Sequence, residues 1–204
     1  MTLSRPLEDL IAPDKAMILT VLERTGQPLT GRTIAALTGT VSQPTTSRLL
    51  IELGRHGLVM KVPGGYEINR DHLAYRAITA LLGTRDELQR RISEDVAKWD
   101  EPPLSVVLFG SAARQQETLD SDIDLLVIRP TAVPFDDERW ATNVANLSAR
   151  VGRWCGSPCE VLEYSSHELA ELKRTGDPLI ASLIRDGITF AGTSLDTLLR
   201  AVPG

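Results

Sequence analysis

The chain has 204 residues, 42% hydrophobic and 24% charged, a composition that predicts a globular protein with one large or two small domains. Its 15 Gly and 12 Pro are ordinary usage, and its two cysteines, Cys155 and Cys159, are too few for a disulfide framework or a zinc ribbon. The first ten residues lack the apolar region of a signal peptide, and no apolar run is long enough for a membrane span, so we expect a cytoplasmic protein without membrane contact. The net charge is −5, yet residues 1–70 hold eight basic and six acidic residues, so the acidic excess lies in the remainder.

The first 70 residues predict three helices followed by a hairpin. Apolar side chains recur at helical spacing over 13–22, and Thr30 and Ser42 are good N-cap residues for two further helices. Two strand-like runs follow, 58–62 and 66–69, separated by a Pro-Gly-Gly turn. This order of elements predicts a small helical domain that ends in a two-stranded wing.

The same stretch resembles the winged helix-turn-helix domain of bacterial regulators over about residues 12–70, through Thr30, Thr38-Gly39, Ser42, Arg48 and Gly57-Leu58-Val59. The resemblance implies that the helix after Ser42 enters the major groove of double-stranded DNA. The candidate DNA-binding residues, four on the exposed side of that helix and one on the hairpin, are Gln43, Thr45, Thr46, Arg48 and Lys61. A module for protein contact or dimerisation is the alternative, because no dense Arg/Lys cluster is present.

Residues 71–100 predict a helical connector with helices over 72–82 and 85–99. Thr84 and Glu87 have the spacing of a capping box at the start of the second helix. The connector could pack between domains or supply a homodimer interface, and Glu101-Pro102-Pro103 would mark its end. The predicted domains are therefore 1–70, 71–100 and 101–204.

The residues that indicate chemistry follow this boundary. The apolar run 104–109 predicts a buried strand that turns at Gly110-Ser111 directly into a helix, a junction at which backbone N–H groups favour an anion. Asp122 and Asp124 open a second apolar strand, where residues two apart share one face. Two neighbouring carboxylates repel each other and become useful when a divalent cation such as Mg²⁺ lies between them.

Gly110-Ser111 and Asp122-Ile123-Asp124, ten residues apart, resemble the signature of the DNA-polymerase-β-like nucleotidyltransferases. The likeness extends over about 104–190, through Ala113-Arg114, Ser121 and the closing segment 179–192, and is greatest to minimal members paired with HEPN proteins in bacterial toxin–antitoxin modules. Gln115 departs from the family, which often has Gly there. The family uses a third carboxylate on a later strand, here 158–164. Glu160 matches that position better than Glu163, which would face the opposite side.

The resemblance implies an α+β fold in which the winged helix-turn-helix and the helical connector precede a mixed β-sheet flanked by helices. Asp122, Asp124 and Glu160 would be the catalytic and metal-binding residues, holding two Mg²⁺ ions, while Gly110, Ser111 and Arg114 would bind a nucleoside triphosphate. The reaction would move a nucleoside monophosphate, with AMP expected, to a hydroxyl group of a protein or a small molecule. The alternatives are a transcriptional regulator that only senses nucleotide, and an antitoxin that binds a HEPN-like toxin.

Overall fold

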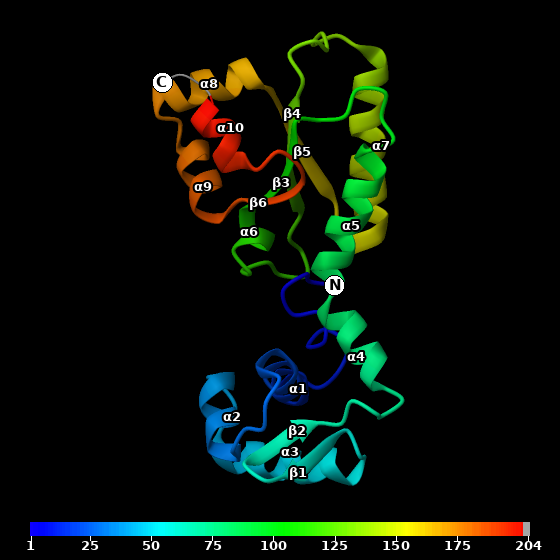
Figure 1. Ribbon diagram of the computed structural model, residues 1–204, viewed down its shortest axis with the longest axis vertical. Coiled ribbons are helices and arrows are strands. Elements are labelled where there is room, and N and C mark those ends of the chain that lie inside the picture. Colours follow the sequence, from blue (N-terminus) through cyan, green and yellow to red (C-terminus); the bar gives the residue numbers. More distant parts are fainter. Residues whose placement is uncertain (202–204) are drawn as a thin grey trace. The chain divides into compact units, whose positions relative to one another are not determined.

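The computed structural model describes residues 1–201, with the backbone alone for Ala201, and the chain divides into two compact units. The N-terminal unit is Arg5–Thr84, and the C-terminal unit combines Met1–Ser4 with the residues from Arg85 onward. Figure 1 labels the elements of both units. The last three residues of the predicted domain 101–204 lie outside the described part of the chain.

The N-terminal unit has the predicted order of three helices, a hairpin and a further helix. Its elements are α1 (Pro13–Thr25), α2 (Gly31–Thr38), α3 (Gln43–Arg55), β1 (Val59–Val62), β2 (Gly65–Ile68) and α4 (Tyr75–Leu82). The side chains of Thr30 and Ser42 accept hydrogen bonds from the Thr33 and Thr45 N–H groups, as their N-cap positions predict. Gly65, at φ +144°, has no room for a side chain, because a Cβ atom there would lie 2.1 Å from the Leu29 carbonyl oxygen.

The predicted connector is shared between the two units. Ile78 of α4 packs in the core of the N-terminal unit, whereas α5 (Thr84–Val96) places Leu88, Ile92 and Val96 in a core of the C-terminal unit. Each helix buries its single apolar stripe in a different core, and the boundary falls at Thr84–Arg85. The two compact units therefore meet inside the predicted connector 71–100.

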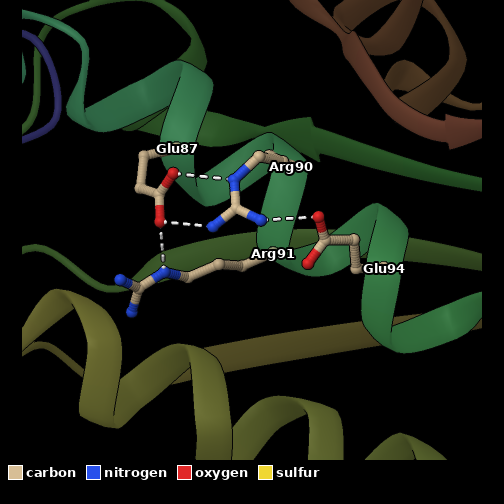
Figure 2. A network of polar contacts seen from close by, with 4 residues as sticks. All are labelled: Glu87, Arg90, Arg91 and Glu94. Carbon is tan, nitrogen blue, oxygen red and sulfur yellow. Dashed lines mark hydrogen bonds and ion pairs between the residues drawn. The ribbon is translucent and has the colours of Figure 1, made fainter.

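The start of α5 also differs from the predicted capping box. The Thr84 hydroxyl donates to the Leu81 carbonyl at 2.6 Å, and Glu87 pairs instead with Arg90 and Arg91, at 2.7 and 2.8 Å. Figure 2 shows this network, in which Arg90 also reaches Glu94. The two hydrogen-bonded guanidinium groups lower the pKa of Glu87 to about 2.

The C-terminal unit is a four-stranded mixed sheet covered by helices on both faces (Figure 1). Its remaining elements are β3 (Ser105–Phe109), α6 (Gly110–Ala113), β4 (Ile123–Arg129), α7 (Glu138–Cys155), β5 (Cys159–Ser165), α8 (Ser166–Thr175), α9 (Pro178–Asp186), β6 (Ile188–Gly192) and α10 (Leu195–Ala201). The strand order is β5-β4-β3-β6, with β4 and β5 parallel and the other pairs antiparallel. The predicted α+β fold class is confirmed.

Alternation along the strands separates two cores. Ile123, Leu125 and Val127 of β4 lie in one core with α5 and α7, while Leu126 and Ile128 lie in the other with α8, α9 and α10. Side chains at even-numbered positions of β4 therefore face α8–α10. In the described part of the chain, no helix combines the length and the apolar character needed to cross a bilayer.

Candidate functional site

The structure brings Asp124 and Glu160 together across the β4–β5 pair, where they are partners in the parallel register. Side chains of register partners on adjacent strands stand on the same face, here the face toward α8–α10. Asp122 lies two residues before Asp124, at the entrance to β4. Asp122 and Glu160 are exposed and Asp124 is half-buried.

Glu163, the other candidate for the third acid, faces the opposite side of β5. It accepts a hydrogen bond from Arg129 Nε at 2.7 Å, and only 7% of the Arg129 side chain is exposed. Glu163 therefore has a structural partner on the far face. The predicted strand parity, with Glu160 and not Glu163 beside Asp124, agrees with this register.

Asp122, Asp124 and Glu160 form an acidic cluster in which the other two carboxylates act on the pKa of Asp124. The partial burial of Asp124 raises its pKa above the usual value, the negative charges of Asp122 and Glu160 raise it further, and the positive charge of Arg114 opposes them. Hard oxygen donors whose charges repel one another are chemically suited to Mg²⁺. As the side chains lie, however, no three or more His, Cys, Asp or Glu groups within residues 1–201 are gathered closely enough to hold a metal ion.

The turn at Gly110 packs directly against the Asp124 carboxylate. Gly110 adopts φ +69°, and a Cβ atom there would lie 1.9 Å from Asp124 Oδ2 and 2.7 Å from its Cγ. Only a glycine leaves the carboxylate in this position. The half-buried Ser111 follows, and the exposed Arg114 has its Nη1 atom 4.0 Å from Asp186 Oδ2 of α9. The triphosphate-binding candidates thus lie beside the acidic cluster.

The helix expected after Gly110-Ser111 is a single turn. α6 ends at Ala113, and a loop continues to Asp122. Few peptide dipoles are aligned in so short a helix, so the predicted contribution of the helix dipole to anion binding is small. Arg114 brings a full positive charge close to Asp124. Gln115, where the family often has Gly, adopts φ +58°, in the left-handed region that glycine favours. Gln115 therefore holds a backbone conformation that glycine adopts more readily.

The DNA-binding prediction is wrong for Thr46. Gln43, Arg48 and Lys61 are exposed and Thr45 is half-buried, but Thr46 is fully buried and its hydroxyl has no hydrogen-bond partner among the described residues. Thr46 precedes Leu49, Leu50 and Leu53 by three, four and seven residues, so it belongs to their buried stripe. The same periodicity would have identified Ser47, which is exposed, as the outward-facing neighbour.

Comparisons with known proteins agree with this architecture. Residues 90–168 match the family model of a nucleotidyltransferase domain. Residues 16–63 match that of the IclR helix-turn-helix domain. The chain therefore carries a nucleotidyltransferase domain behind an N-terminal IclR-type helix-turn-helix domain, which confirms the predicted fusion. A search of curated proteins found no match.

Two solved structures are similar to part of the chain. One is a crystal structure of a toxin-antitoxin with AMP-PNP, at 17% identity and a TM-score of 0.39, covering 56% of this chain and 82% of that chain. The other is a mutant of the toxin-antitoxin MntA-HpeT, at 16% identity and a TM-score of 0.38, with the same shares covered.

Proposed function

We propose that the C-terminal unit transfers a nucleoside monophosphate, with AMP the first candidate, from a nucleoside triphosphate to a hydroxyl group of a protein or a small molecule. The observation that carries this proposal is the position of Asp124, held against the backbone of Gly110 and paired in register with Glu160. A triphosphate bound at the Gly110-Ser111 turn would lie next to the Asp124 carboxylate, which packs against Gly110.

Each residue has a distinct role in this proposal. The Ser111 hydroxyl and the backbone at Gly110 hold the triphosphate, and the Arg114 guanidinium donates to phosphate oxygens. Asp122, Asp124 and Glu160 are the carboxylates that would hold two Mg²⁺ ions. Such ions supply charge neutralisation at the α-phosphate and at the leaving pyrophosphate. The acceptor hydroxyl gives its proton to solvent water and its oxygen bonds to the α-phosphorus. The bond between the α-phosphorus and the bridging oxygen breaks, and pyrophosphate leaves with its electron pair.

Glu160 and Glu163 provide a matched test because they lie on opposite faces of one strand. Glu160→Gln removes a charge from the cluster and should lower the rate of nucleotidyl transfer at least about tenfold. Glu163→Gln should leave the rate nearly unchanged and lower stability, because the buried Arg129 loses the nearer of its two ion-pair partners in the described part of the chain and keeps only Glu168 at 3.8 Å. The readouts are transfer of label from an α-labelled triphosphate and urea unfolding. The reverse ranking of the two rates would contradict the assigned third acid.

Mg²⁺ binding can be tested without activity. A ligand that binds only the folded state raises stability by mass action, so Mg²⁺ should raise the melting temperature of the wild type. Asp122→Asn combined with Asp124→Asn should abolish that rise and leave the fold intact. An equal rise in the double variant would remove these residues as the metal site.

We further propose that the helix-turn-helix binds double-stranded DNA through Gln43, Thr45 and Arg48 of α3 and Lys61 of β1. Gln43 and Arg48 of α3 and Lys61 of β1 are exposed, and Thr45 of α3 is half-buried. Lys61→Ala should weaken binding to all sequences and flatten the salt dependence, because a phosphate contact releases counterions. Arg48→Ala should cost about 1–3 kcal/mol on the preferred site only. A homodimer would require a near-palindromic site.

The alternatives make different predictions in the same assays. A regulator that only senses nucleotide would bind triphosphate and DNA without turnover. An antitoxin would form a stable complex with a HEPN-like toxin, whether or not the carboxylates are intact. Transfer that depends on Asp122, Asp124 and Glu160 distinguishes the enzyme from both.

A further inference from the structure

Both chain connections between the two units lead to the segment that bears the proposed nucleotide site. We call residues 110–122, from Gly110 through Asp122, the site loop. The first connection follows Ser4, whose N–H donates to Glu117 Oε1 of the site loop at 2.6 Å. The second precedes Arg85, whose Nη2 donates to the Ala112 carbonyl of the site loop at 3.4 Å. These two contacts lie within the C-terminal unit and hold the site loop near its start and near its middle.

The contact between Ser4 and Glu117 is largely buried. Glu117 is 4% exposed, and neighbouring Leu3 is packed in the core with α5 and α7. Only one Glu117 oxygen is hydrogen-bonded among the described residues, since Oε2 has no partner there. A buried carboxylate that is only partly satisfied costs folding free energy. The Glu117 carboxylate thus ties the middle of the site loop to the residue that immediately precedes Arg5.

The Arg85 contact is one of three along a polar stripe of α5. Arg85, Gln89 and Ser93 are spaced four residues apart and so lie on one side of the helix. Gln89 donates to the Thr189 carbonyl at 3.4 Å and Ser93 to the Phe190 carbonyl at 2.7 Å. The stripe fastens α5 to the backbone of β6 and, through Arg85, to α6. A shift of the first turn of α5 would therefore act on α6.

The element before α5 belongs to the other unit. α4 ends at Leu82, packs through Ile78 in the core of the N-terminal unit, and is separated from α5 only by Gly83. A rearrangement of that core on DNA binding would reach Arg85 through α4, and it would reach Ser4 through Arg5. The chain thus has two covalent routes from the helix-turn-helix unit to the site loop.

We propose that Arg85 and Glu117 are positioning residues that couple the binding of double-stranded DNA to the binding of Mg²⁺-nucleoside triphosphate. This inference rests on the proposed function. In this proposal the site loop has two states, one in which the Ser4–Glu117 and Arg85–Ala112 contacts are both made and one in which both are broken. Each ligand binds one of these two states more tightly than the other. Coupling of this kind is reciprocal, so nucleotide changes DNA affinity by the same factor as DNA changes nucleotide affinity.

The test is a fluorescence anisotropy titration of the full chain. The probe is a labelled duplex of the region upstream of its own coding sequence, with and without Mg²⁺ and a non-hydrolysable ATP analogue. We expect the analogue to change the DNA Kd of the wild type at least about fivefold. Arg85→Ala and Glu117→Ala should each reduce that change below about twofold. Binding of a fluorescent ATP analogue alone is measured in parallel.

Arg90→Ala is the matched control. Arg90 is on the same helix and is also paired with acidic groups, but both partners, Glu87 and Glu94, belong to α5 itself (Figure 2). The coupling factor should be unchanged in Arg90→Ala. Glu117→Gln retains an oxygen acceptor for Ser4 and should retain most of the coupling. Arg85→Ala keeps the test decisive if Glu117→Ala does not fold.

The outcomes separate this inference from the proposed function. A wild type that binds both ligands with a coupling factor of one overturns the inference and leaves the proposed function in place. Equal losses of coupling in Arg85→Ala and Arg90→Ala also overturn it. A wild type that binds no nucleotide overturns the proposed function, and the inference with it.

Discussion

Gly110→Ala perturbs the point at which the site backbone meets the Asp124 carboxylate. The new methyl group would lie 1.9 Å from Oδ2, 2.7 Å from Cγ and 3.1 Å from Cβ of Asp124, so the Asp124 side chain has to turn about its Cα–Cβ bond and its carboxylate leaves its present position. An alanine at φ +69° costs about 1–2 kcal/mol in backbone conformation. Overpacking adds about 1–3 kcal/mol. We therefore expect a loss of about 2–5 kcal/mol in the free energy of unfolding, measured in urea, and the loss of Mg²⁺-nucleotide binding.

Gly156→Ala separates the two contributions. Gly156 has nearly the same φ, +71°, in the same unit, and a Cβ atom placed there would have no described atom within 4 Å. It should lose only the backbone contribution of about 1–2 kcal/mol and keep nucleotide binding. In an Asp124→Ala background the overlapping carboxylate is gone. Gly110→Ala should then lower the free energy of unfolding by only the backbone contribution of about 1–2 kcal/mol. The reasoning is refuted if Gly110→Ala costs no more than Gly156→Ala in the wild-type background.

Three further predictions concern single side chains. Because the folded state raises the pKa of Asp124, its ionised form opposes folding at pH values above that pKa. Asp124→Asn should therefore stabilise the metal-free protein at pH 7, by an amount that shrinks as the pH falls toward 3.8 in urea titrations, and a constant gain would contradict this. Gln115→Gly should raise the free energy of unfolding by about 1 kcal/mol, because glycine adopts φ +58° without strain. A clearly lower melting temperature in Gln115→Gly would show that Gln115 is not strained. Thr46→Val should leave DNA affinity unchanged and not lower stability, because the buried hydroxyl is unpartnered within residues 1–201; weakened DNA binding would restore Thr46 as a contact.

Local patterns were sufficient for much of the fold. The N-caps Thr30 and Ser42 and the wing turn depend on residues near in sequence, and the structure has them where the sequence predicts. The side of β5 that bears Glu160 also followed from strand parity, because alternation admits only one of two acids three residues apart to a face. These features are decided by short-range geometry.

Other features depend on contacts that no local pattern encodes. The allocation of α4 and α5 to different cores depends on which apolar stripe meets which partner. The contact of Glu117 with Ser4 joins residues 113 positions apart, and nothing near Glu117 in the sequence indicates burial. Thr46 is a different case, since its place in the leucine stripe was visible, but its polar character led to the opposite prediction.

The central claim is that the carboxylate cluster performs nucleotidyl transfer, and the most direct measurement is label transfer. The full chain is incubated with each α-labelled triphosphate, Mg²⁺ and a lysate of the source cells, and labelled macromolecules and small molecules are separated. We predict label in an acceptor with the wild type and none with Asp122→Asn/Asp124→Asn, which should remain folded. Equal labelling by the two proteins, or none by a wild type that binds Mg²⁺-triphosphate, would contradict the claim.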